Sequence, residues 1–300
     1  MRIADCGLRI VGAFVALAAV SAVVGRAYSP ELAAAQRGQA PRSARAAAPI
    51  DLTGYWVSVV SEDWRHRMAT PRKGDYESLP PFTQEGRRIA DSWDLAKDNA
   101  AGLQCKAFGI GGIMRQPGRL HIIWQDDNTL KIDFDAGTQT RLLHFDASKP
   151  PQGEKTWQGH SIAEWETPPR GGGGGGVRGG PAVGGENTPP GGGGRGLRGG
   201  PPPPASLSQG GSLKVVTTHF REGYLRKNGV PYSESASITE YFHRLPPHPN
   251  GDVWLHVLTI VEDPKYFTQP FYTSTHFKLE PNGSKWTPTP CRTAPPPAGK

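Results

Sequence analysis

The chain has 300 residues, a formal net charge of +7, 36% hydrophobic residues, 39 glycines and 30 prolines. This length allows one or two domains. The basic excess lies in residues 1–35 (+1), 36–50 (+3) and 168–210 (+3), and the rest of the chain is neutral, so its foldable part offers no net field for a nucleic acid.

The N-terminus has the charge pattern of an export signal. Arg2 and Arg9 precede an apolar run over residues 10–24, which is too short for a comfortable membrane span. We expect a signal peptide over residues 1–35, cleaved after Ala35, and a periplasmic or secreted protein with no stable membrane span after cleavage. The alternative is an uncleaved N-terminal anchor. Cys6 precedes the apolar run, which argues against a lipoprotein.

Residues 36–50 are predicted to be a disordered tail, and a single β-rich domain follows over residues 51–291. Nine runs in this domain have strand-like composition with turn signals between them. They are residues 53–60, 119–125, 129–135, 138–145, 158–166, 212–220, 236–244, 252–262 and 271–279.

One helix is predicted, over residues 83–98. Thr83 can cap its first turn, and Ile89 and Trp93 fall four residues apart on one side. One flanking helix beside about nine strands favours a mainly β fold, either a single antiparallel β-barrel or a barrel-like sandwich. The last residues, 292–300, are predicted to be a disordered tail.

Residues 168–211 consist almost entirely of Gly, Pro and Arg, a composition that buries too little apolar area to offset its ordering entropy. We interpret this segment as a disordered loop that interrupts the domain between two strands. Its Arg-Gly-Gly repeats at Arg178 and Arg198 lack interleaved aromatic residues, so we expect no binding of nucleic acid. The partners that its positive charge favours are anionic envelope polymers.

Removal of the signal peptide leaves Cys105 and Cys291 as the two cysteines of an exported chain. A disulfide between them is therefore predicted. The alternative is two separate buried thiols.

Two resemblances support these boundaries. Gly54 and Trp56 form a G-x-W that resembles the first strand of lipocalin-type (calycin) barrels, in which a Trp plugs one end. A longer pattern resembles large families of uncharacterised secreted bacterial proteins, and it implies no activity. Its residues are Cys105, 119–122, Arg141, 157–166, 213–217, 229–234, 239–240, 262–264 and 268–270.

Residues that could line a ligand site lie on several of the predicted strands. Strand parity puts Ser161 and Trp165 on one face and His160 on the other. Glu240 lies between Ile238 and Phe242, so on a buried face it needs a cationic partner, and Arg141 and Arg226 are the choices. The predicted ligand-binding set is Trp56, Arg141, His160, Ser161, Trp165, Glu234 and Glu240.

The histidines, including His219 and His276, show no metal-ligand spacing, so we predict neither a metal nor another cofactor. Catalytic residues are unknown, and the sequence leaves three functions open. The first is binding of a small, partly apolar ligand in the barrel. The second is a cofactor-free hydrolase or isomerase that uses Glu240 with Arg141 or His160, and the third is an envelope scaffold.

Overall fold

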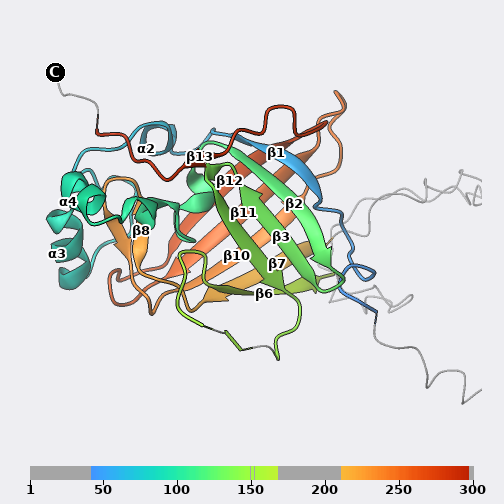
Figure 1. The fold of residues 1–300 in the computed structure, drawn as a ribbon, viewed down its shortest axis with the longest axis horizontal. Coiled ribbons are helices and arrows are strands. Elements are labelled where there is room, and N and C mark those ends of the chain that lie inside the picture. Colours follow the sequence, from blue (N-terminus) through green and yellow to red (C-terminus); the bar gives the residue numbers. More distant parts are fainter. Residues whose placement is uncertain (1–41, 149, 152, 168–210, 297–300) are drawn as a thin grey trace, which may run out of the picture. The chain divides into compact units, whose positions relative to one another are not determined.

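The computed structural model describes residues 42–148, 150, 151, 153–167 and 211–296. The predicted signal peptide, residues 36–41 of the predicted N-terminal tail and nearly all of the Gly/Pro/Arg-rich loop lie outside these residues. Among the described residues, nine strands form a closed β-barrel (Figure 1). In order around the barrel they are β1 (Gly54–Val59), β12 (Phe271–Glu280), β11 (Trp254–Glu262), β10 (Ser237–Arg244), β7 (Ser212–Thr218), β6 (His160–Glu166), β5 (Gln139–His144), β3 (Thr129–Phe134) and β2 (Arg119–Asp126).

Each barrel strand falls on one of the nine predicted runs, which confirms the mainly β fold. The alternation of apolar and polar residues in these runs shows which side chains face the barrel interior. On β3, Leu130, Ile132 and Phe134 are buried, whereas Lys131 and Asp133 lie on the outer face and pair with each other at 2.8 Å. A period of two is what a half-buried strand requires.

The prediction of a wholly antiparallel barrel is wrong at one contact. Strands β5 and β6 are parallel, and in the described chain their register consists of Leu143 with Ser161 and His144 with Ile162. β6 begins level with the last residues of β5 and runs in the same direction, and the 15 residues between the two strands match the connection length that a parallel pair needs. The barrel is therefore mixed.

Trp56 of β1 is fully buried, and its indole Nε1 donates a hydrogen bond to the carbonyl oxygen of Leu52 at 3.0 Å. Gly54 precedes it with φ = 129°, and a Cβ there would lie 2.8 Å from Leu279 Cδ1. The G-x-W pair thus combines a close approach of two strands with a large core side chain.

The predicted helix over residues 83–98 is two helices, α3 (Gln84–Ser92) and α4 (Leu95–Ala100). Thr83 caps α3 as predicted, because its Oγ1 accepts a hydrogen bond from Gly86 N at 3.0 Å. The helix ends early because Trp93 has extended dihedrals and is buried, and Asp94 Oδ1 then caps α4 by accepting from Ala96 N at 2.9 Å.

The remaining elements lie between and around the barrel strands. The helices are α2 (Trp64–Met68), which the sequence did not predict, and the 3₁₀ segments η1 (Gln104–Phe108) and η2 (Ile113–Arg115). The small sheets pair β4 (Ala136–Gly137) with β13 (Thr289–Pro290) and β8 (Gly223–Arg226) with β9 (Val230–Tyr232). Helices α3 and α4 and strand β8 lie at one end of the barrel (Figure 1).

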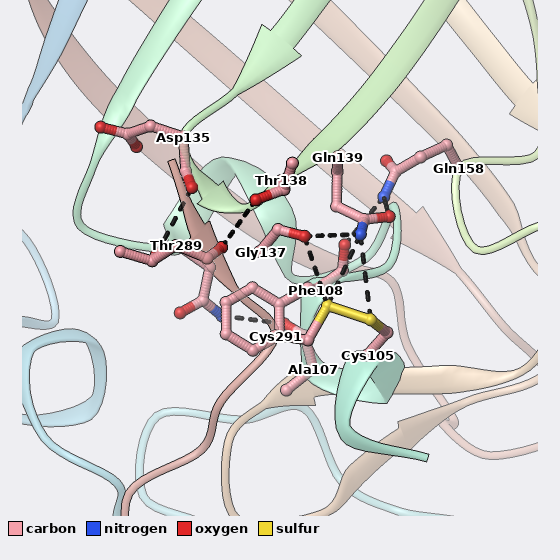
Figure 2. The surroundings of a disulfide bond; sticks show 11 residues. Cys105, Ala107, Phe108, Asp135, Gly137, Thr138, Gln139, Gln158, Thr289 and Cys291 are labelled. Carbon is pink, nitrogen blue, oxygen red and sulfur yellow. Dashed lines mark hydrogen bonds between the residues drawn. A yellow bond between two sulfur atoms is a disulfide. The ribbon is translucent and has the colours of Figure 1, made fainter. Parts of the chain in front are cut away.

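The disulfide between Cys105 and Cys291 is present, with Cα atoms 5.1 Å apart (Figure 2). It joins η1 to Cys291, the residue directly after β13. In β13, Thr289 N donates a hydrogen bond to the Asp135 carbonyl oxygen at 2.8 Å. The amide of Gln139 lies beside the bridge and accepts from Gln158 Nε2 at 3.2 Å. The C-terminal segment is thus attached to the barrel by a covalent bond and a short parallel ladder.

Residues 42–50, which the sequence assigns to a disordered tail, contact the barrel in the structure. Arg45 N donates to the Asp127 carbonyl at 3.0 Å, and the Ala44 carbonyl accepts from Trp165 Nε1 at 2.8 Å. These contacts lie at the β2–β3 turn and at the end of β6. Apolar composition alone gave no sign of them, because both use backbone groups of the tail.

The disulfide yields the first testable prediction. The double substitution Cys105→Ala and Cys291→Ala is expected to lower the free energy of unfolding by about 2–5 kcal/mol, because it frees a very long loop in the unfolded chain. Urea denaturation of both proteins measures the difference. An unfolding midpoint that is the same for the variant and for the oxidised and reduced parent chain would contradict this role of the bridge.

Candidate functional site

A pocket of about 570 Å³ opens where β5 meets β6. Thr140 and Leu142 of β5 precede the short β5–β6 register and have no partner in β6. Lining residues between Pro150 and Gly159 form the opposite wall. The pocket is thus a direct result of the parallel pairing. Its lining is Thr140, Arg141, Leu142, His144, Pro150, Pro151, Glu154, Thr156, Gln158, Gly159, His160 and His219.

Three histidines line this pocket. The rings of His144 and His160 stack with centroids 5.2 Å apart, and His160 Nε2 is buried without a hydrogen-bond partner among the described residues. His219 follows β7 with φ = 54°, a left-handed conformation that is uncommon outside glycine, and its Nε2 lies 3.3 Å from the Gly153 carbonyl oxygen. A strained backbone and an unpaired buried nitrogen are features that ligand sites share.

The wall formed by residues 156–159 is held rigidly. Thr156 Oγ1 accepts from Gly159 N at 3.0 Å, and the Thr156 carbonyl accepts from Arg221 N at 2.9 Å. Gly159 has φ = 64°, and a Cβ there would lie 2.6 Å from the Thr218 carbonyl oxygen. Only glycine allows this approach, so the sequence requires Gly at the position that sets the orientation of His160.

Gln158 connects the pocket to the disulfide region. Its Nε2 donates to the Phe108 carbonyl at 2.8 Å and to Gln139 Oε1 at 3.2 Å (Figure 2). Its Oε1 is buried and has no hydrogen-bond partner among the described residues. Gln158 Oε1 and His160 Nε2 are thus two buried polar atoms without a partner among the described residues that line the pocket.

Behind the pocket wall, Arg141 points into the barrel and forms a buried polar network. Its Nη2 lies 2.5 Å from Glu240 Oε2, and the two side chains are 1% and 0% exposed. Its Nε donates to Ser161 Oγ at 3.0 Å and its Nη2 to Thr217 Oγ1 at 2.7 Å. Arg141 is thus the cationic partner that the sequence predicts for Glu240, whereas the other choice, Arg226, lies beside Asp63.

The structure brings only part of the predicted ligand-binding set together. Arg141, Ser161 and Glu240 meet inside the barrel, and His160 faces the outer pocket, as strand parity implied. Trp56 lies in the apolar core. Trp165 packs against Trp124 and Phe145.

Glu234 lies apart from the others. It is half-exposed and pairs with Lys155 at 2.6 Å. The pocket residues that sequence reasoning missed are His144, His219 and Gln158. All three lie at or next to the ends of predicted strands, but nothing in the sequence showed that β5 and β6 are parallel and that these ends therefore converge.

No protein-family model matches the chain, and comparison with curated proteins and with solved structures likewise found no match. Among the described residues, no helix is long and apolar enough to cross a membrane.

A second group of histidines lies on the outer face of the barrel, on strands that do not line the pocket. His243, His256 and His276 stand side by side on β10, β11 and β12, with ring centroids 6.1 and 4.8 Å apart. His276 Nδ1 also lies 2.8 Å from Glu62 Oε1. Burial, followed by the neighbouring His276 and His243, lowers the pKa of His256 below its usual 6.5.

The buried pair gives a prediction with an internal control. Glu240→Gln is expected to lower the free energy of unfolding by about 3–5 kcal/mol, because Arg141 is left buried without a counter-charge. Glu234→Gln removes a half-exposed ion pair and is expected to cost about 0–1 kcal/mol. Urea denaturation at pH 7 compares the two variants, and equal losses would contradict the assigned role of the Arg141–Glu240 pair.

The histidine row gives a pH prediction. Because the folded-state pKa of His256 lies below the unfolded value of 6.5, its contribution to stability is fully present above pH 6.5. That contribution is lost as the pH falls through the folded pKa. His256→Gln is expected to reduce the loss of stability between pH 7.5 and 5.5, whereas substitution of the exposed His248 is expected to leave it unchanged. A His256 proton shift that titrates above pH 6.5 in NMR would contradict the assignment.

Proposed function

We propose that the protein is an exported binding protein for a small, partly apolar molecule, which binds in the pocket between β5 and β6. The observation that carries this proposal is the pocket itself, with the unpaired buried Nε2 of His160 at its wall. Its volume of about 570 Å³ falls within the range of roughly 300–1,000 Å³ that is typical of small-molecule sites.

The lining has the chemistry of a selective site for such a molecule. Leu142, Pro150 and Pro151 supply apolar surface, while His144 and His160 supply ring faces and nitrogen atoms. The other lining side chains are polar or charged, and such groups fix the orientation of a ligand that the apolar surface buries. This placement differs from the sequence hypothesis of a ligand inside the barrel, where Trp56, Ser161 and Glu240 are fully buried among neighbouring side chains.

Export rests on two observations of different kinds. The disulfide is typical of an oxidising, extracytoplasmic compartment. The signal peptide that would direct the chain to the periplasm or beyond lies in residues outside the described part, as does the Arg-rich loop of the scaffold hypothesis. The resemblance to secreted bacterial families and to lipocalin-type barrels agrees with this proposal.

An enzyme acting through Glu240 is the weaker proposal. Its carboxylate is 0% exposed and paired with Arg141, and it is not among the residues that line the pocket. A general acid or base must come within hydrogen-bond reach of its substrate.

The binding proposal predicts a specific loss. With 1-anilinonaphthalene-8-sulfonate as a small, partly apolar probe, His160→Ala is expected to weaken binding at least tenfold, about 1.4 kcal/mol, in a fluorescence titration. His243→Ala, which removes an imidazole from the outer face, is the matched control and is expected to leave binding unchanged. Circular dichroism confirms that both variants fold. Equal affinities of His160→Ala and the parent chain would contradict the proposed site.

A further inference from the structure

A second cluster of side chains lies away from the pocket, beside α2. His66 belongs to α2, and Asp75 and Glu77 follow in the next loop. One ligand atom from each of the three residues lies within 4.8 Å of the other two, and His66 Nε2 stands 3.4 Å from Asp75 Oδ1. His66 is buried, Asp75 is half-buried and Glu77 is exposed, so the group spans from the protein interior to the surface.

The loop that carries the two carboxylates is fixed from below. Gly74 has φ = 84° in a turn in which Asp75 N donates to the Arg72 carbonyl at 3.0 Å. Asn228, which is fully buried, donates from Nδ2 to the carbonyls of Arg72 and Asp75 at 3.0 Å each. These bonds hold the backbone on both sides of Asp75.

Glu77 is anchored in the same way. The buried Arg226 donates from Nη1 to the Glu77 carbonyl at 2.7 Å. Asn228 and Arg226 both belong to the β8–β9 hairpin, so one hairpin positions both carboxylate residues against α2. Such support of ligand residues by surrounding hydrogen bonds is common at metal sites.

The charges of the cluster are not balanced by their own members. The two carboxylates lie within 4.8 Å of each other, and the buried His66 supplies the one imidazole of the cluster. Arg226 contacts this loop through the Glu77 carbonyl oxygen. The Arg226 guanidinium already lies 3.9 Å from Asp63, so it is shared with a carboxylate outside the cluster.

A further unsatisfied acceptor lies in the same region. Asn228 Oδ1 is buried and has no hydrogen-bond partner among the described residues, although the Nδ2 of the same amide makes two bonds to the loop. A buried acceptor without a donor, in an amide that binds the loop carrying both carboxylates, is satisfied by a water molecule bound to a cation.

We propose that His66, Asp75 and Glu77 bind a divalent transition metal ion, Zn²⁺ in the first place, through Nε2 and two carboxylate oxygens. Two ligands at 2.0–2.1 Å from a tetrahedral ion lie roughly 3.4 Å apart, which matches the His66–Asp75 separation. The imidazole favours a transition metal over Ca²⁺ or Mg²⁺, which take oxygen ligands. The ion joins α2 to the 72–77 loop and leaves a coordination position for water.

The spacing of these three ligands explains why the sequence predicts no metal. His66 precedes Asp75 by nine residues and Glu77 by eleven, which corresponds to no common metal motif. The ligands converge only because Gly74 turns the chain and the β8–β9 hairpin, distant in sequence, binds the turn.

Isothermal titration of the metal-stripped full chain with ZnCl₂, after alkylation of free thiols, tests the proposal. We expect one Zn²⁺ per chain. Glu77→Gln and Asp75→Asn are each expected to weaken binding at least tenfold. Glu77 is exposed, so its variant is expected to fold even if a change at the buried His66 prevents folding, and circular dichroism checks this.

Matched controls separate this site from other ligands. Glu234→Gln removes a carboxylate elsewhere on the surface, and His243→Gln removes a histidine of the outer row; both are expected to retain the parent affinity. Absence of stoichiometric binding, full affinity in Glu77→Gln and Asp75→Asn, or loss of binding in His243→Gln would each overturn the proposal. Displacement of Zn²⁺ by an equal concentration of Mg²⁺ would overturn the preference for a transition metal.

Discussion

The parallel contact between β5 and β6 is the constraint on which the candidate ligand site depends. In an antiparallel barrel, adjacent strands pair along their full length, as β10 and β11 do from Ser237 with Glu262 to Arg244 with Leu255. β5 and β6 are instead parallel strands joined through a crossing segment, residues 145–159. In the described chain they pair only near Leu143 and His144. The barrel still closes, but its wall is incomplete, and the crossing segment forms one side of the pocket.

Because β5 and β6 share so short a register, other bonds must hold these strands together inside the barrel. Arg141 provides them, because its guanidinium joins β5 to Ser161 of β6, Thr217 of β7 and Glu240 of β10. A buried ion pair adds little net stability compared with apolar packing, but its directional bonds define one arrangement of the strands. We infer that the network sets the position of β6, and with it the position of His160. The buried network thus lies on the inner face, and the candidate ligand site on the outer face, of the same two strands.

Much of this fold could be predicted from the sequence, and the failures have a common cause. Local patterns identified every barrel strand, the cap at Thr83 and the pairing of Cys105 with Cys291. The sequence could not show the direction of β6, because the crossing segment contains no helix that would signal a parallel connection. Nor could it show that His144, His160 and His219 surround one pocket, because their convergence follows from that direction. Strand parity separated Ser161 and Trp165 from His160, as the structure does, whereas Glu234 was chosen only for its charge and lies apart from them.

The central claim, that a small partly apolar molecule binds between β5 and β6, is tested most directly by NMR of the histidine side chains. Imidazole ¹H–¹⁵N spectra recorded with and without 1-anilinonaphthalene-8-sulfonate report on every ring at once. We predict shifts for His144, His160 and His219, with His243, His256 and His276 unchanged as internal references on the far strands. Shifts confined to the outer row, or spread equally over both groups, would contradict the claim.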